Sequence, residues 1–415
     1  MGRNTVICGL AAHRAIVATT RGVALSVLCI VAILALSAAR ADRLPASVAD
    51  VSSLLTVGDL TRLPPDDWAV IVEVRDRPAL REPRTGREHR LVAATYVRSN
   101  GLWFLRFLGH ADEPAGDPVA RNAVQMLAAL WRSADRRWGA RCSRLRGEPL
   151  AVWVSRQGEA GAEMWGSSLT VHDAHAARAP VEWLREIAHE YGHYLAPGGS
   201  GYTEPESWTN GVLGERLFAS WLRADLREHV LAPECLPWVS VPDIEAYCVR
   251  QVDPLLERFR GSGPRRADLR RMDRRGFDAC VELLLGVDGL LGGAILMDIL
   301  EFVQTPNGRS PRGIDFEYAL FHWIAYRGVL TARAGGAGVP PKVPLTRGVW
   351  RAAAEGRPVA TVSVEANAWV DWPASLAGAP EIEWQRVSAA PARAKTSAPK
   401  PAASRRPRFG GGAPR

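Results

Sequence analysis

Apolar and polar residues alternate or cluster in short runs from residue 68 onwards, a pattern typical of β-strands. The predicted strands cover residues 68–74, 91–97, 102–107, 150–154 and 168–172. The first three follow one another closely, and we expect them to form an antiparallel meander. Between the third and the fourth strand, residues 118–138 have apolar side chains at helical spacing, which predicts an amphipathic helix packed on the sheet.

From residue 180 to about residue 330 the apolar positions indicate mainly helices. A long apolar segment at 276–303 contains several glycines, which are compatible with close helix packing or with a break. Its most apolar part is interrupted by Asp288 and Asp298, which favours a core helix over a membrane span. Strand-like sequence returns at 360–364. The pattern therefore predicts an α+β fold in which a mixed N-terminal sheet precedes a mainly helical half.

The N-terminal segment has the parts of a secretory signal. Basic residues precede an apolar run at 23–36, and small residues surround a cleavage position after Ala41. We expect a cleaved signal peptide, with an uncleaved signal anchor as the alternative. In either case the rest of the chain is expected to be exported, and it meets a membrane only through an uncleaved leader.

The basic residues concentrate at the two ends of the chain. The 415 residues include 52 basic and 44 acidic side chains, but residues 1–41 and 386–415 hold twelve of the basic ones and no acidic ones. The body therefore has 40 basic against 44 acidic residues, which argues against nucleic acid as a partner. The last thirty residues lack a hydrophobic pattern, and we expect a disordered basic tail rich in Ala, Pro and Arg.

These patterns divide the chain into five expected parts. They are the leader at 1–41, a sheet-containing part at 42–179, a helical part at 180–338, a small β-like region at 339–385 and the tail at 386–415. Four cysteines belong to the exported body, namely Cys142, Cys235, Cys248 and Cys280. In an oxidising compartment they allow two disulfides in any of three pairings, and buried free thiols are the alternative.

Residues 189–193 read His-Glu-Tyr-Gly-His, the H-E-x-x-H pattern of zinc peptidases. Residues four apart on a helix lie about 40° apart around its axis, so His189 and His193 can reach one ion. Glu190 is placed to accept a proton from water instead of binding the metal. Pro180 is a typical first-turn residue of such a helix, and Pro197 with the glycines after it predicts its end.

A catalytic zinc site usually has three protein ligands. The segment after the motif looks like a second helix, and it contains Glu204, Glu206 and Glu215. Thr203 and Glu206 have the spacing of a capping box, and Glu204 would lie in the first turn, where negative charge is favoured. Both of the earlier glutamates therefore have a structural explanation.

Glu215 has no such explanation, because it shares a stripe with apolar residues, where an unpaired carboxylate is costly. We therefore predict Glu215 as the third metal ligand. Gly211 and Gly214 beside it would let the second helix approach the first one closely. The alternatives are the two earlier glutamates, or a histidine such as His172 or His175.

The motif and the second helix resemble the gluzincin branch of the zincin metallopeptidases, a peptidase MA-like group, over about residues 150–225. His189, Glu190, His193 and Glu215 match the two zinc-binding histidines, the catalytic glutamate and the zinc-binding glutamate of that branch. Many gluzincins have an aspartate four residues after the zinc-binding glutamate, and here that position is Ala219.

The resemblance implies a zincin-like fold, a Zn²⁺ cofactor and the hydrolysis of peptide bonds in a peptide or protein substrate by water that zinc and Glu190 activate. It also implies that residues 168–172 form the edge strand that aligns the peptide. Tyr318 and His322 are weaker candidates for stabilising the oxyanion, and core positions explain them as well. An exported binding protein without activity, or an inactive peptidase homologue, is the alternative function.

Overall fold

The computed structural model describes residues 54–388, apart from positions 65, 76, 301, 304, 306–308, 335–340 and 377. The chain divides into two compact units, Met1–Asp67 and Trp68–Arg415. In the first unit a short helix, α3 (Val57–Thr61), begins at Thr56, whose hydroxyl accepts a hydrogen bond from the Asp59 amide at 3.1 Å. The leader at 1–41 lies outside the described residues, so export stays a prediction.

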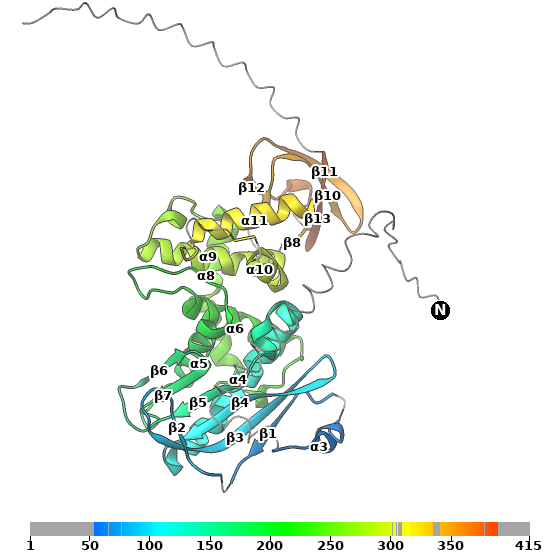
Figure 1. Ribbon diagram of the computed structural model, residues 1–415. Helices are drawn as coiled ribbons and strands as arrows, with labels where there is room; N and C mark the ends of the chain where they lie inside the picture. Colours follow the sequence, from blue (N-terminus) through cyan, green and yellow to red (C-terminus); the bar gives the residue numbers. More distant parts are fainter. Residues whose placement is uncertain are drawn as a thin grey trace, which may run out of the picture. The chain divides into compact units, whose positions relative to one another are not determined.

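A mixed sheet forms the first part of the second unit (Figure 1). Its strands are β1 (Ala69–Glu73), β2 (Leu80–Arg81), β3 (Glu88–Ser99), β4 (Leu102–Ala111), β5 (Leu150–Val154), β6 (Gly161–Trp165) and β7 (Ser168–His172). They lie in the order β1-β3-β4-β5-β7-β6, with β2 paired to β3. Strands β1, β3 and β4 are antiparallel, so the predicted meander is confirmed, whereas β4, β5 and β7 are parallel neighbours.

Parallel strands need a long connection, and the one between β4 and β5 contains helix α4 (Asp117–Trp138). The predicted amphipathic helix is confirmed. Its buried side includes Ala123, Leu127 and Leu130, and it packs on β3, β4 and β5. At Gly109 of β4, an added Cβ would lie 2.9 Å from the carbonyl oxygen of Ala120 in α4. Helix and sheet are therefore in very close contact.

The edge strand nearest the motif helix is β6, which the sequence pattern did not reveal. It pairs antiparallel with β7 after a turn at Gly166, which has φ +62°. The expectation that residues 168–172 form the edge strand is wrong, because β7 lies between β5 and β6. Strand β6 has only five residues, with Glu163 at its centre, and four of them are partly buried. It therefore lacks the clear apolar alternation that identifies a strand.

Helices dominate the next part of the chain, as predicted, and with the mixed sheet they confirm the α+β fold (Figure 1). They are α5 (Pro180–Leu195), α6 (Asn210–Arg227), α7 (Val241–Gln251), α8 (Asp253–Ser262), α9 (Arg274–Leu291), α10 (Gly293–Leu300) and α11 (Gly313–Arg327). The long apolar segment is broken between α9 and α10 at Gly292, which has φ +90°. Within the described ranges, no helix combines the length and the apolar character that crossing a membrane requires.

Helix α6 begins later than the sequence suggested. The expected capping box of Thr203 and Glu206 does not form, because residues 203–209 are a loop and the helix starts at Asn210. The Thr203 hydroxyl donates instead to the Met272 carbonyl at 3.3 Å. The structural explanation for Glu206 is therefore wrong, and this carboxylate is free for another role.

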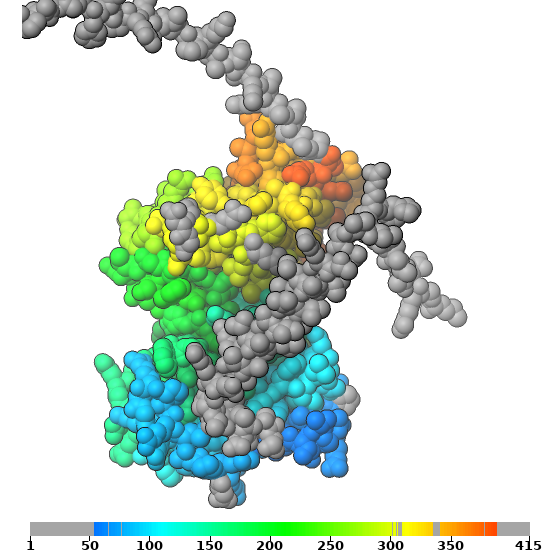
Figure 2. Space-filling model, in the orientation of Figure 1, coloured from blue at the N-terminus to red at the C-terminus, as the bar shows by residue number. Residues whose placement is uncertain are grey.

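The last described part of the chain forms two small sheets. They consist of β8 (Val329–Arg333), β9 (Lys342–Leu345), β10 (Gly348–Ala354), β11 (Arg357–Val364), β12 (Ala368–Asp371) and β13 (Glu381–Ser388). The larger sheet has the order β11-β10-β13-β8, and β12 pairs with β9. Strand β13 extends three residues into the segment expected as a tail, and the rest of that segment lies outside the described residues. In Figure 2 the residues of β10 to β13 are drawn in orange and red.

The four cysteines of the body are all free. Cys142, Cys248 and Cys280 are buried, and Cys235 is partly buried. Of the two alternatives left by the sequence, the structure therefore has the buried free thiols and neither of the two disulfides.

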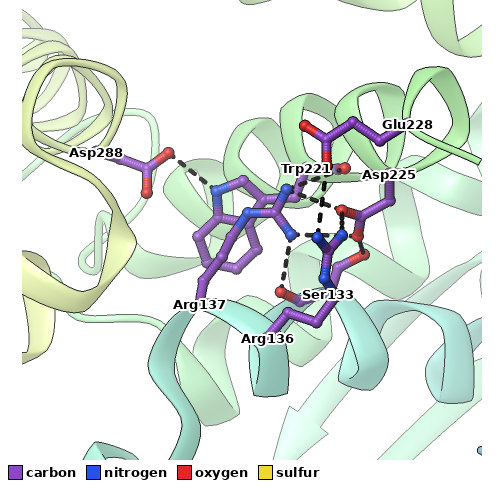
Figure 3. A network of polar contacts seen from close by, with 7 residues as sticks. All are labelled: Ser133, Arg136, Arg137, Trp221, Asp225, Glu228 and Asp288. Carbon is purple, nitrogen blue, oxygen red and sulfur yellow. Dashed lines mark hydrogen bonds and ion pairs between the residues drawn. The ribbon is translucent and has the colours of Figure 1, made fainter. Parts of the chain in front are cut away.

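A buried ionic network joins α4, α6 and α9 (Figure 3). Asp225 of α6 is fully buried and accepts hydrogen bonds from Arg136, Arg137 and Ser133 of α4. On the same helix, the Trp221 indole donates to Asp288 of α9 at 2.9 Å. This network fixes α6 against the helix that crosses the sheet and against α9.

Candidate metal centre

Helix α5 presents the H-E-x-x-H motif along one side. Pro180 occupies its first turn, and Glu182 accepts a hydrogen bond from the Ala179 amide at 2.9 Å. The side that packs on the core contains Trp183, Leu184, Ile187, Tyr191 and Leu195, all of them buried. His189 and His193 lie one turn apart on another side, and each imidazole is about one-fifth exposed.

Glycines bring α6 into direct contact with this side of α5. An added Cβ on Gly214 would lie 2.4 Å from the Cα of Gly192, and one on Gly192 would lie 2.6 Å from the Asn210 carbonyl oxygen. At Gly211 the same atom would lie 2.5 Å from His189 Nε2 and 2.6 Å from His193 Nε2. The predicted close approach through Gly211 and Gly214 is therefore confirmed.

The two imidazoles and Glu190 form a compact cluster of potential metal ligands. His189 Nε2 and His193 Nε2 are 3.2 Å apart, and each of the three side chains offers one donor atom within 4.8 Å of the others. These three side chains could together hold a metal ion.

Glu206 reaches this point from the loop before α6. Its Oε2 lies 3.2 Å from His189 Nε2 and 3.5 Å from His193 Nε2. Its Oε1 is buried and has no hydrogen-bond partner among the described residues. One carboxylate oxygen thus meets both Nε2 atoms, and the other is an unsatisfied acceptor beside them.

The other nitrogen of each ring faces an acceptor. His193 Nδ1 donates to Asn210 Oδ1 at 2.9 Å, and the Asn210 amide donates back to the His193 carbonyl at 3.0 Å. His189 Nδ1 lies 3.6 Å from Glu215 Oε2. Contacts of this kind fix the ring orientation and direct the Nε2 atoms of metal-binding histidines to the metal.

Glu215 therefore contacts the far side of His189 and not the point where the Nε2 atoms converge. Its Oε1 accepts hydrogen bonds from Arg185 Nε at 3.0 Å and from the Tyr247 hydroxyl. These donors satisfy the carboxylate that the sequence left unexplained in an apolar stripe. Arg185 lies one turn before His189 on α5, and Tyr247 belongs to α7, which no local pattern placed next to α6.

The electrostatics of the cluster favour a positive charge between the rings and Glu206. Burial alone would lower the pKa of His189, but its contacts with the carboxylates of Glu206 and Glu215 outweigh this effect and raise the pKa to about 10. Burial would raise the pKa of Glu206, yet its hydrogen bonds to both histidines lower it to about 2. Two lone pairs and a carboxylate converge here, so a proton or a metal cation must neutralise them. The donor set therefore fits a bound cation.

Glu190 has a different environment from Glu206. Its side chain is buried, and burial raises its pKa although both histidines oppose this effect. The backbone N–H of Met164, in the edge strand β6, donates to its carboxylate. Glu190 therefore lies between the histidine pair and the edge of the sheet.

The remaining candidates from the sequence have partners of their own. His172 pairs with Glu163 at 3.0 Å. Tyr318 accepts a hydrogen bond from Arg270 at 3.2 Å, and the His322 ring packs against Phe302. Glu204 is exposed, and His175 pairs with Glu113.

Comparisons with known proteins add little to this geometry. No protein-family profile matches the chain, and no curated protein does so either. Among solved structures, aminopeptidase A from Legionella pneumophila in complex with aspartic acid is similar at 11% sequence identity and a TM-score of 0.30. The match covers 76% of this chain and 40% of that one, so this chain spans about two fifths of that protein. Similarity at this level carries no argument about fold or activity.

Proposed function

We propose that this protein is a zinc-dependent metallopeptidase in which His189, His193 and Glu206 bind the metal ion and Glu190 is the general base. The observation that carries the proposal is the convergence of both Nε2 atoms and the Glu206 Oε2 within 3.2–3.5 Å of one another. Two imidazoles and one carboxylate are a common ligand set of catalytic zinc sites, which keep a fourth position open.

Glu215, the ligand that the sequence favoured, takes a different role in this proposal. It holds His189 through Nδ1, as Asn210 holds His193. In the gluzincin pattern an aspartate follows the zinc-binding glutamate by four residues. If Glu215 corresponds to that aspartate, the ligand position corresponds to Gly211, where a side chain would collide with both rings. The ligand would then come from the preceding loop, as Glu206.

Each residue of the cluster has a distinct chemical task. A zinc ion bound here would polarise a substrate carbonyl and lower the pKa of water. Glu190 accepts the proton of the attacking water and passes it to the leaving amine. Burial raises the pKa of Glu190 from its ordinary acidic value, which suits a group that must both take up and release a proton. Met164 orients its carboxylate through the backbone N–H.

Strand β6 supports a peptide as the substrate. It is the last strand of the sheet on this side, and its Met164 contacts Glu190. An extended peptide paired with β6 would place its carbonyl groups beside Glu190, since added strands bind through main-chain hydrogen bonds. The leader, if it acts as its sequence indicates, would export the enzyme, so we expect an extracytoplasmic peptide or protein substrate.

The test combines metal analysis with one substitution. We expect one zinc per chain, loss of peptide hydrolysis with a chelator, and recovery with zinc. Glu190→Gln should retain zinc but lose about 10²–10⁴-fold in kcat, because it removes proton transfer and not a ligand. Glu186→Gln, one turn earlier on α5, is the matched control and should keep its activity. A wild-type protein without zinc would contradict the site, and an active Glu190→Gln variant would contradict the mechanism.

A further inference from the structure

Glu206 is unusual in this cluster because a loop carries it, whereas His189, Glu190 and His193 lie on a helix. A loop ligand loses conformational freedom when it binds a metal, unless the fold has already ordered it. Residues 199–209, called here the ligand hairpin, contain Glu206 near their tip. The hydrogen bonds of this segment show how its position is set.

The ligand hairpin is closed from base to tip by cross-chain contacts. At the base the Thr209 amide donates to the Gly199 carbonyl at 3.0 Å. Ser200 and Trp208 form the next bridge, and the Gly201 amide donates to the Ser207 carbonyl at 2.9 Å. The tip at 203–206 is tethered to the segment just before α9 through the Thr203 amide, which donates to the Met272 carbonyl at 3.0 Å.

The Thr209 hydroxyl doubles the contact at the base. It accepts a hydrogen bond from the Gly199 amide at 2.8 Å and donates to the Gly199 carbonyl at 3.3 Å. Thr209 is fully buried and is the N-cap residue of α6, yet its side chain makes no capping hydrogen bond to that helix. A threonine at this position normally satisfies a free amide of its own helix. Here the hydroxyl instead contacts Gly199 at the base of the hairpin and also lies 3.9 Å from Cys280 Sγ of α9.

We propose that Thr209 is a positioning residue for the third metal ligand: its hydroxyl clamps the base of the ligand hairpin and so holds Glu206 against the two imidazoles. This inference rests on the proposed metal site. Thr209 directly precedes Asn210, which holds His193. These two adjacent residues therefore position two proposed ligands, Glu206 and His193. Removing the hydroxyl leaves the buried Gly199 amide without this partner and loosens the hairpin.

The experiment measures zinc affinity by competition with a chelator, together with the thermal stability of the metal-free protein. Thr209→Val removes the hydroxyl at nearly constant shape, and it should weaken zinc binding about 10–100-fold, as loss of outer-shell support does. Thr209→Ser keeps the hydroxyl and should bind zinc nearly as the wild type does. Thr346→Val is the matched control, because Thr346 is also buried but its hydroxyl has no partner among the described residues.

Action through Glu206 is tested by a double-mutant cycle. In a Glu206→Ala background, Thr209→Val should cause no further loss of zinc affinity. A further loss of the same size there, or unchanged affinity in Thr209→Val alone, would overturn the inference while leaving the metal site intact. If Glu206→Ala binds zinc as tightly as the wild type, the proposed ligand set fails and the inference fails with it.

A second variant covers the case in which Thr209→Val does not fold. Thr203 is exposed, and its hydroxyl donates to the Met272 carbonyl at the tip of the same hairpin. Thr203→Val should reduce zinc affinity by a smaller factor, and this effect should also vanish in the Glu206→Ala background. If Thr203→Val binds zinc with wild-type affinity, the contacts that tether the ligand hairpin do not position Glu206.

Discussion

Two groups of buried charged side chains contact helix α6, and they differ in how their charges are matched. Near the end of the helix, Asp225 accepts hydrogen bonds from Ser133, Arg136 and Arg137 (Figure 3). Near its beginning, two imidazole nitrogens and the Glu206 carboxylate converge on one point, and among the described residues the ion pairs of Glu206 are with His189 and His193, not with an arginine or a lysine.

This difference indicates a structural role for the group around Asp225 and a chemical role for the group around Glu206. A buried carboxylate that is surrounded by cationic and hydroxyl donors has its charge and its hydrogen bonds matched within the protein. The two imidazole nitrogens and the Glu206 carboxylate have no such match, so their convergence favours a bound cation. Helix α6 serves both groups, because Asp225 fixes its C-terminal half while Asn210 and Glu215 orient the two histidines from its N-terminal half.

The largest effect is expected when Asp225, the centre of the network near the end of α6, is replaced. Asp225→Ala leaves Arg137, which is mostly buried, without its carboxylate partner, and should lower the free energy of unfolding by about 3–5 kcal/mol. Glu228→Ala is the control, since Glu228 is exposed and pairs with Arg136 at 3.4 Å, and it should cost less than about 1 kcal/mol. Urea unfolding measures both. Equal losses would mean that burial of Asp225 adds nothing to the network.

The second test acts on the convergent cluster through shape alone. In Gly211→Ala the new Cβ would overlap both Nε2 atoms, so α5 and α6 must separate, and zinc affinity should fall on the order of 100-fold, as loss of an oriented ligand does. Gly261→Ala in α8 adds a methyl group where nothing lies within 4 Å, and it should leave zinc binding unchanged. Isothermal titration with zinc distinguishes the two. Normal binding by Gly211→Ala would show that the rings do not meet the metal through Nε2.

The third test separates the two glutamates. Glu215→Gln keeps the side-chain shape but removes the charge that faces His189 Nδ1, and it should weaken zinc binding about 10-fold, at the lower end of the range for outer-shell partners. Glu206→Gln removes a charged ligand, so its loss of affinity should be clearly larger. The zinc dissociation constants of both variants decide the matter. The reverse order would restore Glu215 as the third ligand, as the sequence favoured.

Much of the fold follows from local patterns in the sequence. The strands at 150–154 and 168–172 have the predicted bounds, and the helix predicted from residue 118 begins one residue earlier. The motif helix and the close approach of α6 through Gly211 and Gly214 follow from residue spacing as well. In each case the signal lies within one element or between adjacent ones.

The proposed third ligand could not be identified in this way, because its assignment depends on partners distant in sequence. Glu215 appears unpaired in the sequence because its partners lie on other helices, Arg185 on α5 and Tyr247 on α7. Glu206 looked like a capping residue only because the helix was expected to begin before Asn210. The loop from Pro197 to Thr209 is rich in glycine, which could have suggested a later start.

The last expected effect concerns Asp288 of α9, which joins the network around Asp225 through Trp221. Its Oδ2 accepts from Trp221, but its Oδ1 is buried without a partner among the described residues. Burial raises the pKa of Asp288 from 3.8 to about 6, against the opposing effects of Trp221, Arg137 and Arg333. The folded protein thus keeps this proton at pH values where the unfolded chain has released it.

The sign of the resulting pH dependence follows from that difference. As pH rises from about 4 to about 6, the unfolded chain binds fewer protons at this position than the folded protein, so the folded state loses stability. Asp288→Asn cannot ionise and retains an acceptor for Trp221. It should therefore raise the free energy of unfolding by about 1–2 kcal/mol at pH 7.5 and by much less at pH 4.5, since a tenfold change in a dissociation constant corresponds to about 1.4 kcal/mol. Urea unfolding at both pH values measures the gain. An equal gain in the free energy of unfolding at both pH values would mean that the side-chain shape, and not the charge of Asp288, causes the change in stability.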